Sequence, residues 1–504
     1  MKTIKYIKLL LCVTVLPLLL TSCANFLDVN PKAEVLDKDL FETDEGVEDA
    51  LYGAYTTYRS NEIYGKYISI FYPEAMSWNF SPKGGGGLDY LAHADFENAS
   101  ARSLCNATWK KSYQAIGYVN NVIQNLEAIS PTKFRYYNLY KGEALGLRAM
   151  LHFDLLRLFA VDYNANDREA WNKAIPYVTR YSYDITPFYT VGEVYNKVIK
   201  DLKDAEVCLE EDRQLVQVER TNIGSSFTDC RVIHMNLYAV QALLARVYWM
   251  KQDMDSAAIY AKKVIDSQKF PLMTSSDFVQ FERGVLNMKE TIFGLYATTY
   301  ASNCYSIFGK TGSMDMLTLN SNYESWYRDT QGPTPEGSDL RLSAWFGSTL
   351  EVSPACVKMI NSMFDSGSSD SQYSGDSYLG VNLIRIPEMY YIMAEALLEK
   401  DPQQATAYFD KVIESRGMVK FADREEKKIT SNDIFYERRK EFYGEGQQWF
   451  NMKRLKVSIK FSESNILDGR LDKNYRMLIP NDEDLRDNYE IIYLSIYFKM
   501  TDEK

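Results

Sequence analysis

Apolar residues recur every three or four positions along most of this chain, which is the spacing of one buried face of an α-helix. The pattern covers roughly residues 41–60, 101–267 and 383–455. Its clearest runs are residues 109–126 and 144–158, where the steps match an apolar stripe that faces a core. We therefore predict an all-α fold in which amphipathic helices pack on one another.

Two stretches of this pattern look like one unit used twice. Residues 235–267 and 385–417 each predict a helix, a short polar break and a second helix. Their small and large residues fall near the positions of a tetratricopeptide unit, which is about 34 residues long. Residues 139–210 fit a third unit, with the aromatic segment 162–187 between its helices. Such units cannot bury their own faces alone, so they predict a stacked α-α superhelix.

Two long segments between the helices lack the helical periodicity. Residues 61–100 contain Trp78-Asn79 and the run Gly84 to Gly87, and residues 268–382 are rich in Gly, Ser, Tyr and Trp. Long irregular segments in a compact chain are usually functional. We interpret both as loop-rich, ligand-binding insertions in a single domain that spans residues 41–504.

The N-terminus predicts an export signal and a lipid anchor. Three lysines precede an apolar run from Leu9 to Leu20, which has the length of a secretory h-region and is too short to span a membrane. The run ends in Thr21-Ser22-Cys23, and small residues before a cysteine are what a lipoprotein signal peptidase accepts. We predict a signal peptide in residues 1–22, lipidation of Cys23 and a tether in residues 23–40. The alternative is an ordinary secretory peptide that happens to contain a cysteine.

Composition narrows the class of partner. The 504-residue chain has a formal net charge of −11, and an acidic surface argues against a nucleic-acid partner. Its seven cysteines follow no metal-binding or disulfide spacing, so we expect neither a metal nor another cofactor. Aromatic residues make up 14% of the chain. Most of them belong to a helical core, but exposed Tyr and Trp offer flat faces to neutral sugars or peptides.

Three carboxylates raise the question of catalysis. Glu437, Glu441 and Glu445 are spaced to share one helix face, and paired acids are the machinery of glycoside hydrolysis. The basic residues between them favour structural ion pairs instead. The histidines His93, His152 and His234 lack the context of a catalytic or metal site, and His152 is expected in the core. We predict no catalytic residue and no enzyme activity.

The same stretch carries a family resemblance. Residues 437–454 read ERRKEFYGEGQQWFNMKR, which resembles the near-C-terminal signature E-R-x-x-E-x-x-x-E-G of SusD/RagB-type outer-membrane lipoproteins. Further landmarks follow the family order: Phe26-Leu27-Asp28 and Pro31, Trp109 to Asn120, Leu147-Arg148-Ala149, Glu290-Thr291-Ile292-Phe293, Asp339-Leu340-Arg341, and Ile479-Pro480 before Glu483. Two features depart from it: Gln447-Gln448-Trp449 replaces the more usual arginine and aspartate, and the Gln-Asn-Pro-Gly ending is missing.

The resemblance implies a tetratricopeptide-like scaffold whose loop-rich face holds a ligand. It also implies a cell-surface lid, anchored in the outer membrane through its lipid, over a TonB-dependent SusC-like barrel transporter. Such lids deliver oligosaccharides, or peptides in some members. We therefore expect capture of an oligosaccharide. The alternatives are a peptide-capturing RagB-like lid, a tetratricopeptide adaptor without a small ligand, and a surface hydrolase.

The ligand residues of the family lie in the early loop and in the middle loop-rich region. The resemblance thus nominates five positions in this chain: Trp78, Asn79, Tyr296, Tyr323 and Trp326. A Trp or Tyr ring can cover the C–H face of a sugar while an amide hydrogen-bonds its hydroxyl groups. Each aromatic could instead be a core residue.

Other landmarks have structural interpretations. Trp109 and Trp249 sit on apolar helical stripes and are expected in the core. Asp339 and Arg341 are expected to order a loop through a salt bridge.

Overall fold

The computed structural model describes residues 39–163, 168–220, 226–328, 339–361, 379–425, 427–460 and 466–480. The predicted signal peptide, Cys23 and most of the tether lie outside these residues. The chain divides into two compact units, residues 1–50 and 51–504. In the first unit, the Thr43 hydroxyl accepts a hydrogen bond from the Gly46 N–H (3.1 Å), which caps the start of helix α3 (Asp44–Tyr58).

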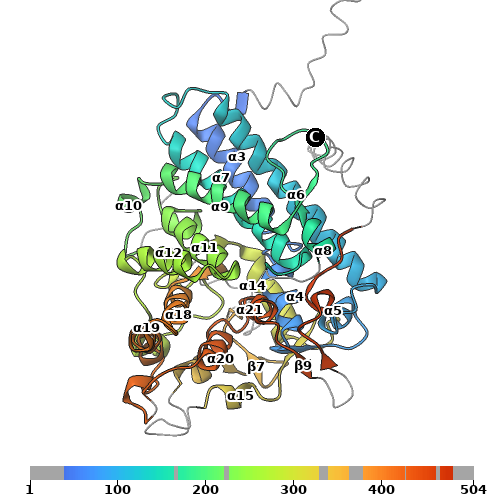
Figure 1. The fold of residues 1–504 in the computed structure, drawn as a ribbon, viewed down its shortest axis with the longest axis vertical. Coiled ribbons are helices and arrows are strands. Elements are labelled where there is room, and N and C mark those ends of the chain that lie inside the picture. Colours follow the sequence, from blue (N-terminus) through green and yellow to red (C-terminus); the bar gives the residue numbers. More distant parts are fainter. Residues whose placement is uncertain are drawn as a thin grey trace, which may run out of the picture. The chain divides into compact units, whose positions relative to one another are not determined.

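The second unit is built from helices that pack in order of sequence, each on the next. Figure 1 shows this row from α6 to α19. The row contains α6 (Ala99–Glu127), α7 (Tyr137–Phe159), α9 (Val191–Cys208), α11 (Leu237–Met250), α12 (Met254–Asp266), α18 (Ile386–Leu397) and α19 (Pro402–Ser415), followed by α20 (Ser431–Glu441) and α21 (Gln448–Leu455). The predicted all-α, tetratricopeptide-like fold is confirmed, with α11–α12 and α18–α19 as its two predicted helix pairs.

Helix α7 is buried between its neighbours in this row. It contacts both α6 and α9, and nearly all of its residues are buried. His152 is one of them: its Nε2 accepts a hydrogen bond from the Val178 N–H (2.9 Å) and its ring stacks on Tyr177 at 4.0 Å. Burial lowers the pKa of His152 to about 3, so the imidazole is neutral. His152 is therefore a core residue, as predicted, and Trp109 and Trp249 are also buried.

Short elements fill the segments between the long helices. The helices are η1 (Tyr67–Phe71), α4 (Tyr72–Met76), α5 (Gly87–Ala92), α8 (Arg168–Asn172), α10 (Asp212–Leu215), η2 (Arg231–Ile233), α13 (Ser275–Val279), α14 (Thr298–Cys304), η3 (Tyr305–Gly309), α15 (Tyr323–Trp326), α16 (Leu340–Trp345), η4 (Phe421–Asp423) and η5 (Asp472–Tyr475). Residues 61–100 are thus less irregular than expected. Each helix in them is too short to display a helical period in the sequence.

The strands of the described residues form two-stranded antiparallel ribbons. These are β1 (Phe80–Pro82) with β5 (Leu317–Leu319), β2 (Ile175–Pro176) with β3 (Phe188–Tyr189), β4 (Thr291–Tyr296) with β8 (Gly380–Arg385), β6 (Phe346–Gly347) with β7 (Ala355–Cys356), and β9 (Ile459–Lys460) with β10 (Ile466–Leu467). The β1–β5 ribbon, in which Phe80 lies opposite Leu319, joins the early segment to the middle one.

A buried ion cluster fixes the C-terminal end of α20. The Glu441 carboxylate is fully buried and accepts hydrogen bonds from Arg341 (2.9 Å), Arg385 (2.7 Å) and Arg416 (2.8 and 2.9 Å). Burial alone would raise the pKa of Glu441. The guanidinium groups of Arg416, Arg385 and Arg341 outweigh it and hold that pKa well below its usual range. We call these four residues the Glu441 cluster.

The neighbouring charges extend this cluster. Arg341 also pairs with Asp339 (2.8 Å), and Glu445 pairs with Arg385 (2.8 Å). The signature carboxylates are therefore structural, as predicted, although most of their partners come from other elements rather than from their own helix. The predicted Asp339–Arg341 salt bridge is also confirmed, and both residues are buried.

Candidate functional site

Four of the five predicted ligand residues flank the β1–β5 ribbon. Trp78 and Asn79 directly precede β1, and α15 begins at Tyr323 and ends at Trp326, shortly after β5. Asn320 ties the two sides together, because its side-chain amide donates to the Trp78 carbonyl (3.0 Å) and its backbone N–H donates to the Asn79 carbonyl (3.3 Å). Residues about 240 positions apart in the sequence thus meet at one place through the antiparallel register.

Arg439 of α20 contacts both of these segments, and we call this set of contacts the Arg439 clamp. Its Nε donates to Asn79 Oδ1 (2.8 Å) and its Nη2 donates to the Trp78 carbonyl (3.2 Å). The same guanidinium lies 3.7 Å from the centre of the Trp326 ring, which is a close cation–π contact. Burial lowers the pKa of Arg439, but a guanidinium remains charged at neutral pH. The clamp fixes Trp326 relative to the Trp78 backbone.

The three aromatic residues keep part of their surface in solvent. Trp78, Tyr323 and Trp326 are all half-buried. The Trp78 indole N–H donates to the Ala92 carbonyl (3.0 Å), the Tyr323 ring packs on Phe346 at 4.8 Å, and Trp326 lies 6.2 Å from Tyr443. Each ring is therefore held by its neighbours and is not a freely rotating surface group. We call Trp78, Tyr323, Trp326 and Arg439 the aromatic surface.

Trp78 also has an unusual backbone. Its φ is +55°, in the left-handed region that residues other than glycine seldom occupy. Such strain persists only where surrounding contacts impose it, and it gathers at functional sites. The contacts here are the Asn320 and Arg439 hydrogen bonds to the Trp78 carbonyl.

Asn79 lies beneath the aromatic surface and is fully buried. Its Nδ2 donates to Glu74 Oε2 (3.0 Å) while its Oδ1 accepts from Arg439, so the amide orients the guanidinium. Glu74 Oε1 accepts from the Gly446 N–H (2.7 Å). Because Glu74 is completely buried, its pKa rises to about 7. The structure therefore gives Asn79 a supporting position, connected through Glu74 to residues 442–446, the turn after α20 that we call the signature turn.

Tyr296 belongs to a different ribbon from the other four predicted residues. It ends β4, opposite Gly380 of β8, and 42% of its surface is exposed. Its carbonyl accepts a long hydrogen bond from Arg59 Nη1 (3.4 Å). The five residues of β4 before it are buried, whereas Tyr296 itself is exposed and is not a core residue.

Sequence reasoning missed Arg439 as a site residue. The sequence predicts only structural ion pairs for the basic residues of this helix, and the separation of 360 positions from Asn79 gives no local signal. Tyr436, one turn earlier on α20, was also not nominated, and 55% of its surface is exposed. Only the fold brings α20 under the β1–β5 ribbon.

The described residues contain neither a metal-binding cluster nor a membrane-spanning helix. Within the described ranges, no group of His, Cys, Asp and Glu side chains could hold a metal ion. None of the helices in those ranges is long and apolar enough to cross a membrane.

Comparisons with known proteins agree with the fold. A family model described as starch-binding and associating with the outer membrane matches residues 25–249, and a SusD family model matches residues 318–503. SusD-like protein P2 of Formosa agariphila is 22% identical over 513 aligned positions, covering 92% of this chain and 94% of that protein.

Solved structures show the same similarity. A putative sugar binding protein from Bacteroides vulgatus is 20% identical, with a TM-score of 0.68 and coverage of 89% of this chain and 97% of that one. Surface glycan-binding protein A from Bacteroides fluxus is 19% identical, with a TM-score of 0.59 and coverage of 82% and 89%. At these identities, the structural matches show a shared fold.

Proposed function

Because the chain belongs to the SusD/RagB family, whose members bind ligands and do not catalyse reactions, we propose that it captures oligosaccharides on the aromatic surface. It passes them to a TonB-dependent, SusC-like barrel partner. The description of the first family model as starch-binding supports a glycan ligand. So do the names of the two structural neighbours, which are a putative sugar binding protein and a surface glycan-binding protein.

The observation that carries the proposal is the Arg439 clamp. It holds an indole, whose exposed part can stack on a sugar ring, beside the strained Trp78 segment. Aromatic rings fixed in place bind a flat C–H face without losing much conformational freedom. Tyr323 adds a hydroxyl group at the same surface. The net charge of −11 is compatible with a neutral ligand and disfavours an anionic polymer.

Replacing Trp326 with alanine tests the proposal. A glycan array first identifies the oligosaccharide that binds most tightly, and calorimetric titration then measures its affinity. We expect Trp326→Ala to weaken that affinity about 10-fold, because a stacked aromatic contact is worth roughly 1.5 kcal/mol. The melting temperature should stay within a few degrees of wild type, since Trp326 is half-buried and belongs to a four-residue helix.

Tyr296→Ala is the matched control, because this nominated residue lies on another ribbon. If it weakens binding and Trp326→Ala does not, the ligand surface is elsewhere. If no glycan on the array binds and a peptide library yields a ligand instead, the chain is a peptide-capturing lid. If neither library yields a ligand and both the Trp326→Ala and the Tyr296→Ala proteins still bind a protein partner, the chain is an adaptor.

We also propose that Cys23 carries the lipid and that residues 23–40 are the tether of a lid on the outer cell surface. The family model that matches from residue 25 is described as associating with the outer membrane, which supports this location. Cys23→Ala should yield a soluble, folded protein with unchanged glycan affinity in the cell supernatant or periplasm, while uptake falls. Retention of this variant in the outer-membrane fraction with full uptake would show that barrel contacts alone hold the lid.

A further inference from the structure

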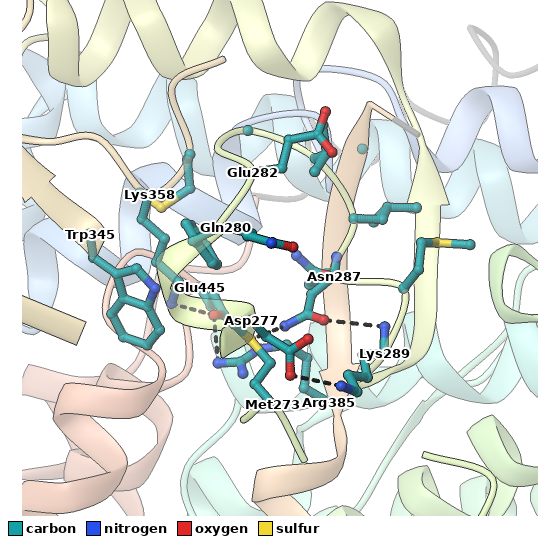
Figure 2. Close-up of a pocket in the computed structure, with 18 of the residues that line it drawn as sticks. Met273, Asp277, Gln280, Glu282, Asn287, Lys289, Trp345, Lys358, Arg385 and Glu445 are labelled. Atoms are coloured by element: carbon teal, nitrogen blue, oxygen red, sulfur yellow. Dashed lines mark hydrogen bonds and ion pairs between the residues drawn. The ribbon is translucent and has the colours of Figure 1, made fainter. Parts of the chain in front are cut away.

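A cavity of about 460 Å³ opens beside the β4–β8 ribbon, and none of the five nominated ligand residues lines it. Its wall follows residues 273–289 and is completed by β8, Trp345 and Lys358. Figure 2 shows Trp345 and Lys358 on one side, and Asn287 and Lys289 on the other. The volume lies within the range of small-molecule sites.

Most charged groups of the cavity are already paired. Lys358 Nζ lies 2.5 Å from Glu445, Arg385 Nη2 lies 2.8 Å from the same carboxylate, and Lys289 pairs with Asp277 at 2.7 Å (Figure 2). Each of these cations therefore already has a carboxylate partner within the wall, and both carboxylates are engaged in return, so we assign none of these groups to a ligand.

Arg220 is different, because its hydrogen-bond partners among the described residues are backbone carbonyls. Its Nε donates to Gln217 (3.0 Å) and its Nη2 to Lys269 (2.7 Å), and Nη1 donates to Met288. In the part of the chain that the structure describes, no carboxylate forms an ion pair with it. Burial lowers the pKa of Arg220 to about 10, since little nearby negative charge offsets the loss of water. A partly buried cation without a counterion lines the cavity.

Trp345 supplies a donor without an acceptor. The residue is only 2% exposed and lines the cavity, yet its indole N–H has no hydrogen-bond acceptor among the described residues. Lys358 Nζ lies over the face of the Trp345 ring, 3.8 Å from its centre. The N–H edge of the indole is therefore the part that can bind a polar ligand. A buried donor without an acceptor has lost its hydrogen bond to water, so this edge favours an incoming oxygen atom.

The third donor is the side-chain amide of Asn382. Its Oδ1 already accepts hydrogen bonds from the Asn287 N–H (3.1 Å) and from the Thr291 hydroxyl (2.5 Å). The NH₂ group is thus the end of this cavity-lining amide that remains to bind a ligand. Phe281, Leu286 and Met273 provide apolar walls between the polar groups.

We propose that this cavity binds a small polar ligand that carries a carboxylate. The carboxylate pairs with Arg220, and the Trp345 N–H and the Asn382 amide donate to the remaining ligand oxygens. A neutral ligand would leave the Arg220 charge uncompensated, and a cation would be repelled by that charge, because the cavity carboxylates Asp277 and Glu445 are already held in ion pairs. An acidic sugar and the C-terminal carboxylate of a short peptide share this chemistry.

Matched probe pairs separate charge from shape. Calorimetric titration of the full chain with galacturonic acid and with galactose compares two sugars that differ in the carboxylate. Dialanine and dialanine amide form the corresponding peptide pair. We expect the carboxylate-bearing member of at least one pair to bind at least about 10-fold more tightly than its partner that lacks the carboxylate. Equal binding within both pairs, or no binding by either acid up to 10 mM (about −2.7 kcal/mol), would overturn the proposal.

Variants then locate the bound acid. Arg220→Gln should weaken its affinity about 10-fold or more, Arg220→Lys should restore part of it, and Trp345→Phe should weaken it several-fold while keeping the ring. Unchanged affinity in folded Arg220→Gln protein would place the acid elsewhere and refute the assignment. Trp326→Ala should leave this affinity unchanged, which separates the cavity from the proposed glycan surface.

Discussion

Replacing Glu441 with glutamine is expected to lower the free energy of unfolding by about 3–5 kcal/mol. The substitution leaves Arg341, Arg385 and Arg416 buried with a neutral amide in place of the carboxylate that all three contact. Removing one partner from a buried ion cluster costs far more than the cluster contributes relative to apolar packing, because the remaining charges keep their desolvation penalty. Urea unfolding at pH 7, followed by circular dichroism, measures the difference.

The same variant should lose less stability in acid than wild type does. The folded pKa of Glu441 lies well below the unfolded value of 4.5. The contribution of the Glu441 charge to the free energy of unfolding is therefore fully present above pH 4.5, and it is lost as the pH falls through the folded pKa. The difference between wild type and Glu441→Gln should be constant from pH 6 to 8 and should shrink in more acidic solution.

Glu414→Gln provides the control for Glu441. The Glu414 side chain is 63% exposed and pairs with Lys420 at 3.2 Å on the surface. Its loss should change stability by less than about 0.5 kcal/mol. A Glu441→Gln protein as stable as wild type would contradict the structural role of the cluster. Cleavage of a polysaccharide by wild type, abolished in this variant, would instead support a hydrolase.

Gly446→Ala is expected to destabilise the protein by about 4 kcal/mol or more, enough to abolish folding of a marginally stable domain. The glycine has a φ of +70°, where a side chain is strained, and an added Cβ would lie 2.1 Å from the Ser69 carbonyl oxygen. The clash is with backbone, so no rotamer change relieves it. Moving the turn would also break the hydrogen bond from the Gly446 N–H to Glu74.

Gly53→Ala is the control for Gly446→Ala, because it makes the same substitution at a glycine that has room for a side chain. Gly53 is exposed within helix α3, and an added Cβ meets nothing within 4 Å. This change should raise stability by about 0.5–1 kcal/mol through helix propensity. Thermal unfolding of both variants compares the two positions. Equal melting temperatures would mean that the signature turn tolerates a side chain and that its glycine is not required by packing.

Helical periodicity predicted the scaffold well, because each long helix displays several turns of its buried stripe in the sequence. The pairs α11–α12 and α18–α19 follow directly from such stripes. The short helices η1 and α4 show no comparable period. The β4–β8 pairing places Thr291 opposite Arg385, and the segment between the two strands has no periodicity. No local sequence pattern therefore predicts this pairing.

The site was only partly predictable. Family resemblance nominated Trp78 and Trp326, which the structure holds through one guanidinium. Asn79 was expected to hydrogen-bond a ligand, but its side chain is buried and bonded to Glu74 and Arg439. Whether an amide faces solvent or core depends on elements distant in sequence, and Arg439 is 360 positions away. Residue type alone does not carry that information.

The Arg439 clamp also bears on how the protein folds. It joins Trp78 and Trp326 to a helix near the C-terminus, so its contacts close loops of more than 100 and more than 350 residues, whereas the paired helices close short ones. Long loop closure is entropically costly, so we infer that the helix pairs form early and the aromatic surface forms late. A chain cut before α20 should retain its folded helix pairs, but it would lack the clamp that orients the aromatic surface.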